Sequence, residues 1–287
     1  MKLCRFTSVS NPFPHVGLAV DDDASILDLS EAGVDSLTVL LDAPDLVARV
    51  QALANRPLRR FALADVRLLP PVERQEVWAA GVTYLRSKKA RMEESEHSAT
   101  AYDRVYDADR PELFFKSMPQ KVVGPGAAVG IRADAKWNVP EPELALVLNR
   151  RNEIVGYTLG NDMSSRDIEG ENLLYLPQAK IYRGGCALGP FVVVGVDEPT
   201  VRGWTIGVRI ERDGTEVFAG ETSVGNIKRG FSELAGWLCR SQEFPDGAIL
   251  FTGTGVVPGN DFTLAAGDVI HVRISGVGVL TNPVVVV

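Results

Sequence analysis

The sequence contains few of the residues that define disulfide-rich or zinc-binding proteins. Among its 287 residues there are three cysteines and three histidines, and their positions match no zinc-ligand spacing. The cysteines, Cys4, Cys186 and Cys239, are odd in number and far apart, which is typical of a protein in a reducing compartment. We therefore expect a cytoplasmic protein whose hydrophobic core is large enough to be stable without disulfide bonds.

The sequence also lacks an excess of basic charge and a long apolar segment. The formal net charge is −7 at pH 7, whereas nucleic-acid binding requires clustered lysines and arginines. No apolar run approaches the roughly 20 residues of a membrane-spanning helix, and the start MKLCRF has no signal-peptide core. We expect no nucleic-acid partner and no membrane partner. An anionic substrate would have to be bound locally, by a metal and a few basic residues.

Acidic residues next to apolar runs are the most informative feature that the sequence does contain. Glu141 and Glu143 flank Pro142 at the start of an apolar run, and residues i and i+2 of a strand point to the same face. Asp162 follows a second apolar segment, 154–160. A Glu-x-Glu pair alone is usually solvated, but carboxylates grouped in this way favour a site for Mg²⁺, Mn²⁺ or Ca²⁺. A metal that is held by only a few protein ligands keeps coordination positions open for substrate, so we interpret the site as catalytic.

The order and spacing of several motifs resemble the fumarylacetoacetate hydrolase superfamily, from about Val77 to Val287. These motifs are EPE at 141–143, NDMSSRD at 161–167, Lys180 ahead of the Gly189-Pro190 turn, and FTGTG at 251–255. The resemblance implies a strand-rich α+β protein whose catalytic domain is a mixed β-roll. It also implies that Glu141, Glu143 and Asp162 bind Mg²⁺ or Mn²⁺, that Lys180 belongs to the active site, and that Thr254 and Gly255 lie beside the substrate.

One position distinguishes branches of this family. Hydrolytic and decarboxylating members carry an Asn-Tyr-x-x-His-x-x-Glu motif whose histidine works with an acid to activate water, whereas this chain has Ser87 at that place. Segments 81–84, 110–116 and 168–182 instead resemble the branch that dehydrates 2-keto-3-deoxy-pentonates such as 2-dehydro-3-deoxy-D-arabinonate. The resemblance therefore implies a metal-dependent lyase that converts a small anionic 2-keto acid to 2,5-dioxopentanoate.

Dehydration of such an acid needs a base, an acid and groups that bind the substrate. A metal chelated by the substrate would stabilise the enolate that forms when C3 loses a proton. Lys180 is the candidate base, because a partly desolvated lysine near a cation can be neutral; its alternative role is a salt bridge to the metal ligands. Candidates for the acid that protonates the C4 hydroxyl are Glu112, Glu169 and Glu171. Arg86 and Lys116 are candidates for substrate binding, with a buried ion pair as the alternative for Lys116.

Two domains are expected. Residues 1–70 form a small N-terminal α/β domain with helices at 36–42 and 43–55, which serves packing or oligomer contact and ends in the proline-containing linker 68–71. Residues 71–287 form the catalytic domain, with strands at 77–81, 144–149, 153–160, 190–196, 204–211, 215–220, 249–252, 269–275 and 284–287, and a helix at 226–240. The charged segment 87–109 is interpreted either as a lid or as a surface helix.

Two other functions remain open at this level. The first is a metal-dependent acylpyruvate-type C–C hydrolase, decarboxylase or isomerase, which Ser87 disfavours. The second is a non-enzymatic protein that binds a metal or metabolite. In each case we expect a homo-oligomer.

Overall fold

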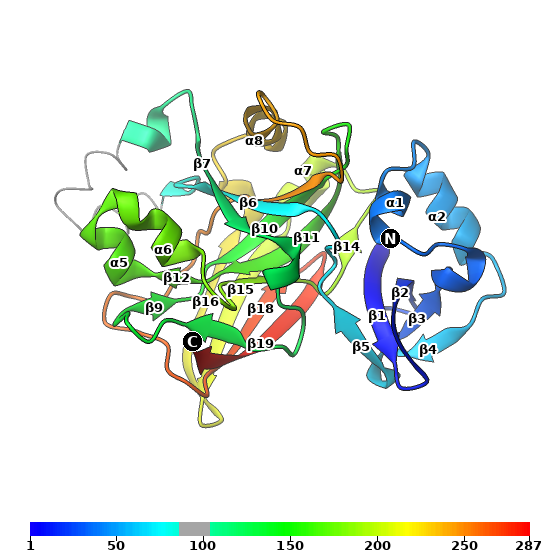
Figure 1. Ribbon diagram of the computed structural model, residues 1–287, viewed down its shortest axis with the longest axis horizontal. Coiled ribbons are helices and arrows are strands. Elements are labelled where there is room, and N and C mark those ends of the chain that lie inside the picture. Colours follow the sequence, from blue (N-terminus) through cyan, green and yellow to red (C-terminus); the bar gives the residue numbers. More distant parts are fainter. Residues whose placement is uncertain (86–103) are drawn as a thin grey trace.

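The computed structural model describes residues 1–85 and 104–287, and it has the strand-rich α+β architecture that the sequence predicts (Figure 1). The N-terminal part contains β1 (Lys2–Ser8), β2 (Asn11–Val20), β3 (Ser25–Asp28), β4 (Arg60–Ala62) and β5 (Val66–Leu69), with α1 (Leu37–Leu41) and α2 (Leu46–Ala54) on one side. Figure 1 shows this part in blue at one end of the molecule.

In the remainder of the described chain, strands are the most frequent regular elements. They are β6 (Glu76–Gly81), β7 (Glu112–Ser117), β8 (Val129–Ile131), β9 (Asn138–Val139), β10 (Pro142–Leu148), β11 (Ile154–Asp162), β12 (Ser164–Ser165), β13 (Cys186–Leu188), β14 (Val192–Val193), β15 (Thr205–Arg212), β16 (Thr215–Ser223), β17 (Ala248–Phe251), β18 (Val269–Ile274) and β19 (Gly278–Val286). The α-helices are α5 (Arg166–Glu171), α6 (Leu176–Lys180), α7 (Glu198–Arg202) and α8 (Phe231–Leu238). Single 3₁₀ turns are η1 (Leu29–Ala32), η2 (Leu63–Asp65), η3 (Pro119–Lys121), η4 (Leu173–Tyr175) and η5 (Val224–Asn226). No helix among the described residues is both long and apolar enough to cross a membrane.

These strands build two large sheets and one small one. The largest sheet has the order β4-β3-β2-β1-β14-β11-β10-β17-β6-β7, and β5 and β13 pair with β1 and β11 beside this path. The second sheet has the order β16-β15-β18-β19-β8, and β12 pairs with β9. Most neighbours are antiparallel, but β17 and β6 are parallel, as are β19 and β8. The mixed sheet that we expected is thereby confirmed.

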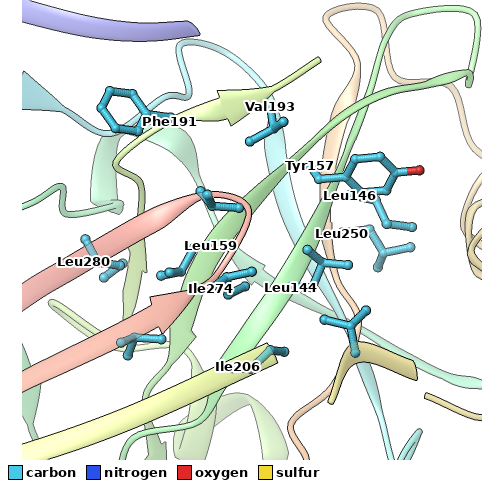
Figure 2. Packing of buried hydrophobic residues seen from close by; sticks show 14 of the residues in the cluster. Leu144, Leu146, Tyr157, Leu159, Phe191, Val193, Ile206, Leu250, Ile274 and Leu280 are labelled. Atoms are coloured by element: carbon cyan, nitrogen blue, oxygen red, sulfur yellow. The ribbon is translucent and has the colours of Figure 1, made fainter. Parts of the chain in front are cut away.

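The main hydrophobic core lies between the two large sheets (Figure 2). Leu144 of β10 and Leu159 of β11 face Ile206 of β15 and Ile274 of β18, and all four side chains are fully buried. Burial of each such side chain contributes roughly 1.5–3 kcal/mol to folding. This dry core holds β10 and β11 rigidly at the centre of the molecule.

A glycine allows the central strands to pack closely. Gly160 of β11 lies opposite Glu143 of β10 in the strand register. A Cβ atom at Gly160 would lie 2.0 Å from Cε1 of Phe251 in β17, so no larger residue fits without moving the ring. The close packing positions the end of β17 beside the start of β10.

The expected elements are largely present, and the differences have local causes. β14 comprises only Val192–Val193 rather than 190–196, because Pro190 has no N–H to donate and Gly195 takes a positive φ of 72°. α8 begins at Phe231 rather than at 226, because Val224–Asn226 forms a 3₁₀ turn. In the second part of the chain, β7, β8, β9, β12 and β13 were not among the expected strands, and β19 begins at Gly278 rather than at 284. The lid or surface helix at 87–109 lies mostly outside the described residues.

The predicted domain boundary falls just after β5, at Pro70 and Pro71. Sheet pairing continues across it, since β1 pairs with β5 on the N-terminal side and with β14 of the second part. The division at residue 70 remains a prediction.

Glu73 connects the two parts of the chain. Its carboxylate accepts hydrogen bonds from the Ser36 hydroxyl (2.6 Å) and from the N–H groups of Leu37 (3.1 Å) and Thr38 (2.9 Å), at the start of α1. Burial by itself would raise the pKa of Glu73, but these hydrogen bonds outweigh burial and hold the pKa below its ordinary value of 4.5. A carboxyl group with a lowered folded-state pKa stabilises the protein above its unfolded-state pKa.

We expect Glu73→Gln to lower the free energy of unfolding by about 1–3 kcal/mol at pH 7, because hydrogen bonds to a charged acceptor are lost. The difference from wild type should shrink as the pH falls below 4.5 and through the folded-state pKa of Glu73. Urea denaturation at several pH values measures both effects. Glu243→Gln, at an exposed position, is the control and should behave as wild type. An equal loss at pH 7 and pH 3 would contradict this role of the charge.

Candidate active site

Three buried carboxylates lie together at the ends of β10 and β11. One oxygen from each of Glu141, Glu143 and Asp162 lies within 4.8 Å of the other two. Their exposed fractions are 3%, 2% and 1%. Oxygen ligands of one Mg²⁺ or Ca²⁺ lie about 2.0–2.6 Å from the ion, so ligands on opposite sides are about 4–5 Å apart. The spacing and the hard oxygen donors therefore fit one divalent cation.

Strand register brings the three carboxylates together. β10 and β11 are antiparallel, with Pro142 opposite Asn161, and the N–H of Asp162 donates to the carbonyl of Glu141 (2.9 Å). The Asn161 side-chain oxygen accepts from the N–H of Glu141 (3.1 Å), which fixes the backbone ahead of the strand. Pro142 is the first residue of β10, a position that tolerates a residue without an N–H.

Glu143 lies in the least favourable environment for a negative charge. Burial raises the pKa of Glu143 well above its ordinary value, and the neighbouring carboxylates of Asp162 and Glu141 raise it further. The N–H of Gly253 donates to Glu143 (2.6 Å) and opposes this rise. A bound cation would stabilise the charged form of Glu143 in the same way, which is a second reason why this cluster fits a metal.

Three basic side chains, two from helices and one from a strand, surround the cluster. Nζ of Lys180, at the end of α6, donates to Glu141 (2.7 Å) and Asp162 (3.0 Å) and also contacts the Ser164 hydroxyl. Arg166, the first residue of α5, donates from Nη2 to the other oxygen of Glu141 (2.7 Å). Lys116 of β7 forms an ion pair with Asp162. All three basic side chains are buried.

A narrow cavity opens onto these groups. Its walls include the three carboxylates, Arg166 and Lys180, together with Glu112, Phe114, Glu169 and Thr254. Glu112 enters from the start of β7, whereas Glu169 is a buried residue of α5. The cavity thus presents a lysine and two carboxyl groups next to a potential metal position.

The other candidate residues occupy varied positions. Arg86 and Ser87 lie outside the described residues. Glu171 is exposed and is not among the described residues that line the cavity. Thr254 lines the cavity, and its hydroxyl donates to the carbonyl of Val256 (3.1 Å). Gly255 packs on the ring of Tyr84, where an added Cβ would lie 2.4 Å from Cδ1.

Two residues of the site were missed by the sequence reasoning. Arg166 belongs to the recognised 161–167 motif, but no role was assigned to it from the sequence. Gly253 belongs to the recognised 251–255 motif, and its N–H donates to the Glu143 carboxylate (2.6 Å). Its φ of 92° is a conformation that favours glycine, so the Gly-Thr-Gly pattern itself was the signal available in the sequence.

Comparison with known proteins gives two close relatives over nearly the full chain. One, named probable 2-keto-3-deoxyxylonate dehydratase, is from Haloferax volcanii; it is 43% identical over 283 residues, covering 94% of this chain and 96% of the relative. The other, named 2-dehydro-3-deoxy-D-arabinonate dehydratase, is from Saccharolobus solfataricus; it is 38% identical over 275 residues, covering 94% and 92%.

Solved structures and a family model agree with these relatives. A structure described as 2-keto-3-deoxy-D-arabinonate dehydratase complexed with magnesium and 2,5-dioxopentanoate superposes with a TM-score of 0.83 at 34% identity, covering 100% of this chain and 99% of the other. Residues 76–285 match the model of the fumarylacetoacetate (FAA) hydrolase C-terminal domain. The chain therefore belongs to the fumarylacetoacetate hydrolase family.

Proposed function

We propose that this protein is a Mg²⁺-dependent dehydratase of a 2-keto-3-deoxy sugar acid, either 2-dehydro-3-deoxy-D-arabinonate or a similar pentonate, and that it forms 2,5-dioxopentanoate. The observation that carries the proposal is a single cavity in which Lys180 and two glutamates, Glu112 and Glu169, surround a buried three-carboxylate cluster. The names of the two close relatives and the magnesium and product in the similar structure support it.

The cluster has the donor set for Mg²⁺, with Mn²⁺ or Ca²⁺ as alternatives. Glu141, Glu143 and Asp162 would hold the ion through carboxylate oxygens. When bound, the ion supplies Lewis acidity that polarises the 2-keto group of the substrate and makes a proton on C3 easier to remove. Arg166 keeps Glu141 in place through its 2.7 Å hydrogen bond.

Lys180 is the proposed base. Its Nζ lies at the cavity wall, within hydrogen-bonding distance of Glu141 and Asp162, and it reaches the site from a different element than the carboxylates do. Nζ takes the proton from C3 of the substrate. The ring of Phe114, whose centroid lies 5.7 Å from Nζ, covers this nitrogen on the side of the cavity that β7 forms.

Glu112 or Glu169 is the proposed acid. Both line the cavity, and a carboxylic acid there donates its proton to the C4 hydroxyl as the C4–O bond breaks, so that water leaves. The electrons of the broken C3–H bond form the C3–C4 double bond. The product of this step is 5-hydroxy-2-oxopent-3-enoate, an isomer of the final product. Loss of a proton from C5 and uptake of a proton at C3 move the double bond to C4–C5, and the resulting enol then loses its hydroxyl proton and gains a proton at C4 to give 2,5-dioxopentanoate. Glu171 remains a third candidate from the sequence, although its exposed position provides no support.

We further propose that the protein works in the cytoplasm as a homo-oligomer on a small anionic 2-keto acid. The free cysteines Cys4, Cys186 and Cys239 support a reducing compartment. The second sheet exposes three valines, Val217 of β16 and Val279 and Val285 of β19. Association of copies through this sheet would cover them. A mass of 31.1 kDa by light scattering, that of one chain, would contradict the oligomer.

The proposed reaction predicts that purified protein with Mg²⁺ converts 2-dehydro-3-deoxy-D-arabinonate to 2,5-dioxopentanoate without carbon–carbon cleavage, and that EDTA abolishes turnover. Glu141→Gln and Asp162→Asn should each reduce turnover and Mg²⁺ affinity by about 10-fold or more, because each removes a charged ligand. Mass spectrometry of the product and calorimetry of Mg²⁺ binding measure these effects.

The matched control is Glu153→Gln, an exposed carboxylate in the turn between the same two strands, which should leave both quantities unchanged. Fast cleavage of acylpyruvates would favour the hydrolase alternative instead. Normal Mg²⁺ binding without turnover of any 2-keto acid would favour a binding protein.

The roles of base and acid can be separated by exchange of the C3 hydrogens with deuterated solvent. Lys180→Met should bind Mg²⁺ but lose both C3 exchange and turnover by about 100-fold or more, because no base remains. Replacing the true acid, by Glu112→Gln or Glu169→Gln, should stop water loss while C3 still exchanges. NMR of the recovered substrate measures exchange.

Glu171→Gln is the control for the acid and should retain wild-type turnover. If Lys180→Met still exchanges C3 at the wild-type rate, the lysine serves only as a counter-ion and another residue is the base.

A further inference from the structure

Lys116 is the least accessible basic residue of the site. It belongs to β7, its side chain is 0% exposed, and it is not among the described residues that line the cavity. Phe114, two residues earlier on the same strand, does line the cavity. Lys116 was a candidate for substrate binding, with a buried ion pair as the alternative, and its position favours the ion pair.

The ammonium group of Lys116 lies among three oxygen atoms. It forms an ion pair with Oδ1 of Asp162, and it donates to the carbonyl oxygens of Met163 (3.0 Å) and Lys180. Two of the three N–H donors of the ammonium group go to these carbonyl oxygens, and its charge faces Oδ1 of Asp162. All three contacts lie within the protein, in agreement with the absence of Lys116 from the described residues that line the cavity.

These contacts join the two functional parts of the site. The Lys180 carbonyl ends α6, where helical carbonyls lack a partner within the helix and a positive charge is favourable. Asp162 ends β11, so one nitrogen connects the end of a strand to the end of a helix. The length of the Lys116 side chain therefore sets the distance between Asp162, a proposed metal ligand, and Lys180, the proposed base.

Lys116 also determines which basic side chain each oxygen of Asp162 contacts. Oδ1 pairs with Lys116, whereas Oδ2 accepts from Nζ of Lys180 (3.0 Å). This division prevents the carboxylate from turning about its bond. Partners that orient a metal ligand in this way commonly contribute 10- to 100-fold, by order of magnitude, to metal affinity or activity.

We propose that Lys116 is a positioning residue that holds Asp162 and Lys180 in their working arrangement and does not contact the substrate. The proposal rests on the proposed function only in that it assigns roles to Asp162 and Lys180. Its first measurement, Mg²⁺ affinity without substrate, does not depend on which reaction the protein catalyses.

The test compares Lys116→Met, which keeps the length of the side chain but removes its charge, with Lys121→Met at an exposed lysine of η3. For Lys116→Met, Mg²⁺ affinity by calorimetry should fall by about 10-fold or more. At saturating Mg²⁺, kcat should fall by about 10-fold or more while KM stays within about threefold, because substrate contacts are retained. Lys121→Met should match wild type in all three.

Two results would overturn the proposal. A large rise in KM with unchanged Mg²⁺ affinity and kcat would make Lys116 a substrate ligand, the first of the two roles considered from the sequence. Reduced thermal stability with Mg²⁺ affinity, kcat and KM all unchanged would leave it a purely structural residue.

A measurement on the wild-type protein covers the case in which Lys116→Met does not fold. A crystal structure with Mg²⁺ and pyruvate, a 2-keto acid without a C4 hydroxyl, should show Nζ of Lys116 still on Asp162, Met163 and Lys180. A hydrogen bond from this nitrogen to pyruvate would contradict the proposal directly.

Discussion

The site depends on the burial of three carboxylates at one point. A buried charge is costly unless positive charge or hydrogen bonds compensate it, and the penalty grows when like charges lie side by side. The compensation comes from Lys116 of β7, Arg166 of α5 and Lys180 of α6. These elements must therefore converge on the ends of β10 and β11, and this requirement explains why a sheet protein carries two short helices at this position (Figure 1).

Positive charge does not compensate the three carboxylates equally. Glu141 and Asp162 each form ion pairs with basic side chains, whereas among the described contacts Glu143 is held by the N–H of Gly253. Burial and the two neighbouring carboxylates accordingly raise the pKa of Glu143. A divalent cation supplies positive charge where the basic side chains supply least. The protein thus prepares the cluster for a metal while keeping it stable enough to fold.

The scaffold matters because the compensating groups cannot adjust independently. β10 and β11 are held in place by the core between the two large sheets (Figure 2). Because Gly160 has no side chain, the ring of Phe251 packs closely against β11. Gly253 lies two residues after the end of β17, so the N–H that reaches Glu143 is placed by the same packing. Close-packed interiors transmit such constraints, because side chains there have little freedom to shift.

The sequence by itself predicted the carboxylate cluster and most strands of the second part of the chain. Alternation along a strand puts Glu141 and Glu143 on one face, and an acidic residue directly after an apolar run places Asp162 at a strand end. These patterns are local, so they can be recognised without a structure. The resemblance to a family added Lys180 and the nature of the reaction.

Only the tertiary structure decided which other polar residues reach the site. Glu169 and Glu171 are two residues apart in one short helix, and residues at that spacing point to different sides, so packing of α5 buries the first and exposes the second. Arg166 meets Glu141 across 25 positions, and Lys116 meets Asp162 from another strand. Such pairings form because a buried carboxylate needs a positive partner from whichever element packs beside it, and the sequence does not contain that proximity.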